Sequence, residues 1–326
     1  MIGNIRTLSL VAATVALFGG AAQAQDWPTE PLRLFVGFPA GSSPDSIARL
    51  IVEPLSQALG QPVVIENKPG AGGVIGVQQM VEHGRTGHSF GVTINGPLTT
   101  SQRLLPDLAY DTATDIVPVA LIATSPLALT VAADFPADDV AAFIVRAKEA
   151  PEAVSYGSVG PGSGSHLTTE LFADAAGIQL YHIPFQSYAQ VATSLLAGDV
   201  DAGFMAPSAA LPFVDSGQLK MLGITSSAPF PQAPDVPVLA GQAGIPDDFQ
   251  AELWNAFIAP AGTDPAVVER LNTEINTILK DEQLRQKLLA MGWKATPGTP
   301  EALADRIASD TTLWSHALDL VEAQER

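Results

Sequence analysis

The stretch PLRLFVGFPAGSSPDSIARLIVEPLSQALGQPVVIE, residues 31–66, decides the fold class because its hydrophobic pattern changes twice. PLRLFVGF (31–38) is short and apolar, as a buried strand is. Residues 44–60 carry apolar side chains at helical spacing and end at Gly60. QPVVIE (61–66) then returns to a β-branched run. A strand, a helix and a second strand in this order predict a βαβ unit and therefore an α/β fold.

The same alternation continues along most of the chain. Strand-like runs recur at 88–95, 153–159, 178–185 and 200–206, with amphipathic stretches between them. The last third reads as mostly helical, and no segment repeats at a fixed period. We therefore expect parallel-rich sheets flanked by helices, with ligands bound beyond the carboxyl ends of the strands.

Composition narrows the possible partners. The chain has 326 residues and is 47% hydrophobic, enough for about two domains. Its formal net charge of −18 makes nucleic acids and anionic membranes poor partners. It contains no cysteine, which excludes disulfides, thiolate metal sites and a cysteine nucleophile.

The N-terminal segment is typical of a secretory signal. Arg6 precedes an apolar run from Leu8 to Phe18, and small residues then end in Ala-Gln-Ala. A run of roughly eleven apolar residues is too short for a spanning helix, which needs about twenty. We expect cleavage after Ala24 and an exported mature protein.

Loops at the predicted strand ends are rich in glycine, serine and proline rather than in acids, bases or metal ligands. Each leads into a predicted helix, whose first N–H groups and positive dipole end favour an anion. Together they predict one polar pocket. The loops are GFPAGSSPD (37–45), NKPGAGG (67–73), NGPLTTS (95–101), SVGPGSGSH (158–166) and PFQSYA (184–189).

The glycine-rich loop 67–76 does not fit a nucleotide site. A P-loop ends in Gly-Lys-Ser/Thr, whereas Val74 and Ile75 follow Gly73 here. Gly70, Gly72 and Gly76 are spaced G-x-G-x-x-x-G and follow the second strand, not the first. Two interpretations stay open: a cradle for an anion, or glycines needed only for a tight turn and close helix packing.

The sequence offers no catalytic or metal-binding constellation. No serine lies in G-x-S-x-G, the elbow of α/β hydrolases. His83 and His88 lack HExxH spacing, and His182 and His316 are interpreted as structural or surface residues. His166 starts a helix beside a glycine-serine loop, so it is a candidate for the pocket wall but not for catalysis.

Several motifs, in this order along the chain, resemble the periplasmic solute-binding proteins of tripartite tricarboxylate transporters, the Bug family. The resemblance implies a two-lobed periplasmic-binding-protein fold of type II, without cofactor, that holds a small organic carboxylate between its lobes. It implies delivery to a membrane permease by a monomer. The motifs include WPTEPLRLFVGFPAGSSPDSIAR, LGQPVVIENKPGAGGVIG, LAYDTATDIVPVALI, YGSVGPGSGSHLTTELF and WNAFIAPAGTDPAVVERLN.

We expect residues 25–123 plus 225–326 to form the first lobe and residues 124–224 the second. Asp45 is expected to cap a helix rather than touch the ligand. The other residues that the resemblance assigns to ligand binding lie on the five loops. They are Phe38, Ala40, Gly41, Ser42 and Ser43; Ala71, Gly72 and Gly73; Asn95; Ser158, Gly162, Ser163 and His166; and Gln186, Ser187 and Tyr188.

The chain departs from the family pattern at four positions. Ser42 and Asn255 stand where the family has glycine, and Gln186 and Ser194 replace a usual basic residue and a usual aspartate. The loss of a cation predicts a ligand with one gripped carboxylate and an apolar, aromatic or neutral far end, in preference to a tricarboxylate. Alternatively, Gln186 and Ser194 face away from the ligand. A ligand-sensing partner of a signalling protein and an uncharacterised hydrolase remain alternative functions.

Overall fold

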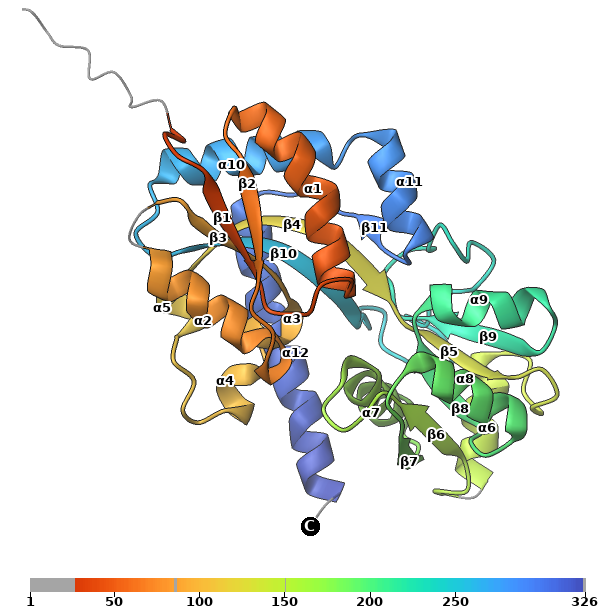
Figure 1. Cartoon of the computed structure of the whole chain (residues 1–326). Coiled ribbons are helices and arrows are strands. Elements are labelled where there is room, and N and C mark those ends of the chain that lie inside the picture. The colour runs from red at the N-terminus through yellow and green to blue at the C-terminus, as the bar shows by residue number, and fades with distance from the viewer. Residues whose placement is uncertain (1–26, 85–86, 150, 325–326) are drawn as a thin grey trace, which may run out of the picture.

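The structure is a computed structural model of the chain, and it describes residues 27–84, 87–149 and 151–324. The predicted secretory signal, residues 1–24, lies outside the described residues. The described residues form two β-sheets, each flanked by helices, as Figure 1 shows. The predicted α/β class is therefore confirmed.

Sheet A has six strands in the order β11-β4-β10-β3-β1-β2. The opening stretch folds as predicted, because β1 pairs in parallel with both β2 and β3. The strands of sheet A are β1 (Leu32–Val36), β2 (Val63–Asn67), β3 (Ser89–Ile94), β4 (Ile116–Pro126), β10 (Glu252–Pro260) and β11 (Lys294–Ala295).

Strand β10 was not among the strands predicted from the sequence. It precedes the mostly helical C-terminal part and is central in sheet A. It also runs antiparallel to both of its neighbours, with Asn255 opposite Ile94 of β3 and Ala123 of β4. Sheet A is therefore mixed rather than parallel-rich, as we had predicted it to be.

Sheet B has five strands in the order β7-β6-β8-β5-β9. Its β6, β7 and β8 pair in parallel, whereas β5 runs antiparallel to β8 and β9. Sheet B is therefore also mixed. Its strands are β5 (Ala128–Ala132), β6 (Ser155–Ser158), β7 (Tyr181–Pro184), β8 (Ala202–Met205) and β9 (Leu219–Ile224).

Helices cover both sheets, and no described helix is long and apolar enough to cross a membrane. Around sheet A lie α1 (Ser43–Leu59), the 3₁₀ turn η1 (Ala71–Gly73), α2 (Val74–His83), α3 (Asn95–Leu98), α4 (Ser101–Leu104), α5 (Thr112–Asp115), α10 (Pro265–Ile278), α11 (Glu282–Ala290) and α12 (Pro300–Gln324). Around sheet B lie α6 (Val140–Glu149), α7 (Gly164–Ala176), α8 (Tyr188–Ala197) and α9 (Pro207–Asp215).

The last helix, α12, packs against strand β4 of sheet A and against helix α7 beside sheet B. Near its start, Leu303 and Ile307 join the core beneath β10 that also contains Trp254. Further along, Trp314 and Leu318 pack against Leu167 and Leu171 of α7. In Figure 1, α12 runs from behind sheet A down toward α7. The part of the chain around sheet A therefore supplies a helix that also touches the part around sheet B.

The two chain crossings between the sheets are tied together at Thr225. The first crossing is Leu127, between β4 and β5, and the second follows β9. Leu127 N–H donates to the Thr225 hydroxyl over 2.9 Å, and that hydroxyl donates to the Ala251 carbonyl over 2.6 Å. Thr225 is fully buried, so these contacts are shielded from water.

Candidate functional site

A cavity of about 580 Å³ lies between the two halves, and it is lined from both. Sheet A contributes the ends of β1, β2 and β3, and sheet B contributes the loop after β6 and the start of α8. None of the lining residues carries a charge. The lining consists of Phe38, Ser43, Pro44, Ala71, Gly72, Ile94, Asn95, Gly96, Thr100, Ser101, Leu104, Leu105, Val159, Gly162, Ser163, Gly164, Leu167, Tyr188, Leu253, Trp293 and Trp314.

Helix N-termini from both sides converge on this cavity. Ser43 begins α1, Gly164 begins α7 and Tyr188 begins α8, and all three line the cavity. Ala71 and Gly72, in the turn that leads into α2, also line it. The first N–H groups of a helix lack intrahelical partners, and its dipole is positive at that end. The cavity therefore favours an anion although its lining has no cationic side chain.

Asp45 holds the first loop in shape from a fully buried position. It accepts hydrogen bonds from the Gly41 amide (2.8 Å), from Arg49 Nε (2.8 Å) and from Asn67 Nδ2 (2.8 Å). Burial alone would raise the pKa of Asp45, but Arg49, the Gly41 amide and Asn67 outweigh it and lower the pKa. We expected Asp45 to cap the helix, and this expectation is wrong, because the backbone amide that it accepts, that of Gly41, lies before the helix. Asp45 fastens the loop to the end of β2.

The glycines of the glycine-rich loop differ in role: some allow close packing, and one is open to the cavity. Gly72 has φ 64°, and a Cβ added there would meet no atom within 4 Å, so this backbone is open to the cavity. By contrast, a Cβ on Gly76 would lie 2.4 Å from the Gly37 Cα, and one on Gly73 would lie 2.7 Å from the Phe38 ring. Gly73 and Gly76 therefore allow close packing, whereas Gly72 faces the cavity.

His166 shapes the loop after β6 from behind. Its Nδ1 accepts the Gly162 amide over 3.0 Å, and its ring stacks on His182 with centroids 4.0 Å apart. Burial, with a smaller effect of His182, lowers the pKa of His166 to about 4. His182 Nε2 in turn bonds the Ser158 hydroxyl over 2.7 Å. The neutral imidazole thus positions the loop and is not part of the cavity lining.

The residues that the sequence assigned to ligand binding fall into two groups. Those lining the cavity are Phe38, Ser43, Ala71, Gly72, Asn95, Gly162, Ser163 and Tyr188. Those outside its lining are Ala40, Gly41, Ser42, Gly73, Ser158, His166, Gln186 and Ser187. The Gly41 amide is occupied by Asp45, and the Ser187 hydroxyl accepts the Gln190 amide at the start of α8.

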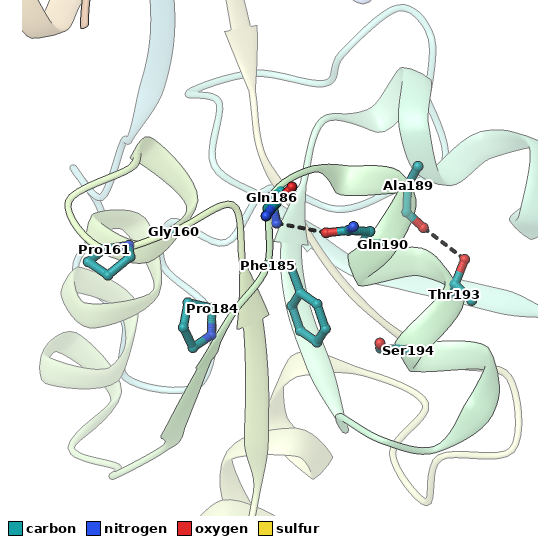
Figure 2. A pocket seen from close by; sticks show the side chains of 9 residues that line it. All are labelled: Gly160, Pro161, Pro184, Phe185, Gln186, Ala189, Gln190, Thr193 and Ser194. Carbon is teal, nitrogen blue, oxygen red and sulfur yellow. Dashed lines mark hydrogen bonds between the residues drawn. The ribbon is translucent and has the colours of Figure 1, made fainter. Parts of the chain in front are cut away.

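Gln186 and Ser194 share a different hollow, of about 720 Å³, on sheet B's side of the molecule. Figure 2 shows it between the Gly160–Pro161 turn and helix α8. The backbone N–H of Gln186 donates to Gln190 Oε1 over 2.8 Å. Their common departure from the family pattern thus changes this hollow rather than the wall of the cavity between the sheets.

The cavity also has an apolar wall that the sequence reading did not identify. It combines side chains from α4 and the residue after it, α7, β10 and α12, which are distant in sequence. Two of its members, Leu104 and Leu105, are adjacent in sequence and are 49% and 36% exposed. We call the following set the apolar wall: Leu104, Leu105, Leu167, Leu253 and Trp314.

Two sheet-bearing halves with an uncharged, helix-N-terminus-lined cavity between them define a binding protein for a small solute. In the part of the chain that the structure describes, no cluster of His, Cys, Asp or Glu could hold a metal ion.

The chain belongs to the tripartite tricarboxylate transporter receptor family, TctC, whose family model matches residues 47–318. Its curated relatives include the protein in the tcbD-tcbE intergenic region of Pseudomonas sp. strain P51, 35% identical over 96% of this chain and 93% of that protein. Another is BugT of Bordetella pertussis, 33% identical over 95% of each. The predicted family is therefore confirmed.

Solved structures agree on the fold. A TctC solute-binding protein from Polaromonas matches with a TM-score of 0.81 and 27% identity, covering 90% of this chain and 99% of that one. Rpa4515 of R. palustris, solved with adipate, matches with a TM-score of 0.73 and 29% identity over 90% and 98%. MatC of Rhodopseudomonas palustris, solved with malate, gives 0.69 and 28% over 89% and 99%. The family consists of periplasmic transporter receptors. The Polaromonas neighbour is a solute-binding protein, and BugD, another solved neighbour, is a periplasmic binding protein, so the family is one of solute-binding proteins and not of enzymes.

Proposed function

We propose that this protein captures a small organic carboxylate in the cavity between its lobes and delivers it to the membrane permease of a tripartite tricarboxylate-type transporter. The observation that carries the proposal is the convergence of α1, the α2 turn, α7 and α8 on an uncharged cavity. A carboxylate accepts charge-assisted hydrogen bonds from backbone N–H groups and needs no arginine. The carboxylates bound by Rpa4515 and MatC support the same ligand class.

The remaining parts of the proposal concern how the protein works in the cell. We propose cleavage after Ala24, a monomeric mature protein, and lobes formed by residues 25–123 plus 225–326 and by 124–224. The ligand would bridge the lobes and favour a closed arrangement over an open one. Membership of a transporter receptor family favours delivery to a permease over partnership with a signalling protein.

Ligand binding can be tested with carboxylates and their amides. At about a hundred times Kd, a ligand adds roughly 2.7 kcal/mol to the free energy of unfolding, which raises the melting temperature measurably. We expect at least one carboxylate from a panel of mono-, di- and tricarboxylates to do so, and its amide to fail. A shift by nucleotides and by no carboxylate would contradict the proposal. Export is tested separately. The intact mass of the exported protein should equal that of a chain that begins at Gln25.

A further inference from the structure

The apolar wall leaves large side chains uncovered next to an anion site. Leu104 and Leu105 are consecutive, both line the cavity, and both keep a substantial part of their surface exposed. Exposing apolar surface to water costs about 25 cal/mol per Å² of accessible area, so a covered arrangement is favoured. Something apolar that enters the cavity would cover these side chains.

The wall belongs to the same cavity as the helix N-termini. Gly164 starts α7 and lines the cavity, and Leu167 on the next turn of the helix belongs to the wall. A Cβ added at Gly164 would lie 2.5 Å from Leu253 Cδ2, so the anion-favouring end of α7 touches the wall directly. One small ligand can therefore contact both.

Among the described residues, no lysine, arginine or histidine lines the cavity. Arg103 precedes Leu104 in the chain, but its guanidinium is engaged elsewhere. It donates to the Ser315 carbonyl over 2.8 Å and pairs with Asp319 (2.6 Å) and Glu322 (2.8 Å) of α12. The backbone amides of Leu104 and Leu105 already donate to the carbonyls of Thr100 and Ser101. A carboxylate against these two leucines would therefore lose water without gaining a counter-charge or a free backbone N–H group there.

We infer that the preferred ligand is a carboxylate with a single charged end and an apolar body, aliphatic or aromatic, that lies against the apolar wall. This inference rests on the proposed function and narrows its ligand class. It differs from the argument based on Gln186 and Ser194, because those residues line the other hollow.

Matched ligand pairs test the inference on the unmodified protein by calorimetry. Hexanoate and adipate have the same chain length and differ by one carboxylate. Benzoate and terephthalate have the same aromatic ring and also differ by one carboxylate. We expect the monocarboxylate of at least one pair to bind at least tenfold more tightly than its dicarboxylate. Tighter binding of both dicarboxylates would overturn the inference while leaving the carboxylate site intact. Binding of no carboxylate at all would overturn the proposed function itself.

Variants locate the effect on the wall. Leu104→Gln combined with Leu105→Gln should weaken the preferred monocarboxylate at least tenfold and leave acetate, which has no apolar body, unchanged. Leu196→Gln is the matched control, because Leu196 is 39% exposed on α8 outside the cavity. Equal affinities in the double variant and the control would overturn the assignment of these leucines. Both leucines are partly exposed, so the double variant is expected to fold.

Discussion

Replacing Asp45 with asparagine should release the first loop of the cavity. The carboxylate is fully buried and accepts bonds from Gly41, Arg49 and Asn67. Asparagine keeps one oxygen but points an amide donor at groups that also donate, so at least one charge-assisted bond is lost. Such bonds contribute about 1.5–3 kcal/mol each, so we expect the free energy of unfolding to fall by about 2 kcal/mol. Loop disorder should also weaken ligand binding.

Guanidinium chloride unfolding at pH 7 measures the effect, with Glu53→Gln as control because Glu53 is exposed on the same helix. The pKa of Asp45 is lowered in the folded protein, so its stabilisation is complete above about pH 4 and disappears as the pH falls through the lowered pKa. The difference between wild type and Asp45→Asn should therefore shrink only in acid. Identical unfolding midpoints for the two variants at pH 7 would refute this account of the loop.

Two further predictions concern the glycine loop and the stacked histidines. Gly72→Val should weaken carboxylate binding more than tenfold with a native far-UV dichroism spectrum, and it should also lower the melting temperature, because valine is strained at the φ of 64° found there. Gly76→Val should lower the melting temperature because its Cβ would meet the Gly37 backbone. Unchanged affinity in Gly72→Val would show that Gly72 has no part in binding. Burial lowers the pKa of His166 to about 4 in the folded protein. Between pH 6.5 and pH 4 the unfolded state therefore binds a proton at this residue and the folded state does not. The free energy of unfolding should fall by about 3 kcal/mol over this range. In His166→Gln this pH dependence should be smaller by that amount, and an unchanged slope would contradict the assigned cause.

The sequence predicted the first βαβ unit well because its signals are local. The apolar spacing of residues 44–60 and Gly60 at the end mark α1 without reference to the rest of the chain. Strand β10 was missed because it is buried on both faces in the centre of sheet A, so it lacks alternation. The strands with which β10 pairs, β3 and β4, lie more than a hundred residues earlier, so no local sequence pattern indicates the pairing.

The part of the candidate site that could be predicted is the part formed by loop backbone, because the residue types of these loops are recognisable in the sequence. Glycine, serine and proline at strand ends indicated the loops around Ser43, Gly72 and Ser163. The apolar wall was not predictable, since Leu167 and Trp314 on amphipathic helices look like ordinary core residues. The resemblance alone could not separate residues that touch the cavity from those that hold the loops, such as His166.

The bonds at Thr225 and the length of α12 restrict how the lobes can rotate. With Leu127 and Ala251 both bonded to one buried hydroxyl, the two crossings act as a single axis rather than as independent tethers. Helix α12 is anchored on one side of that axis by Leu303 and on the other by Trp314, about 16 Å apart along a stiff rod. The closure proposed above would therefore have to rotate about these two crossings and change the contact between α7 and α12.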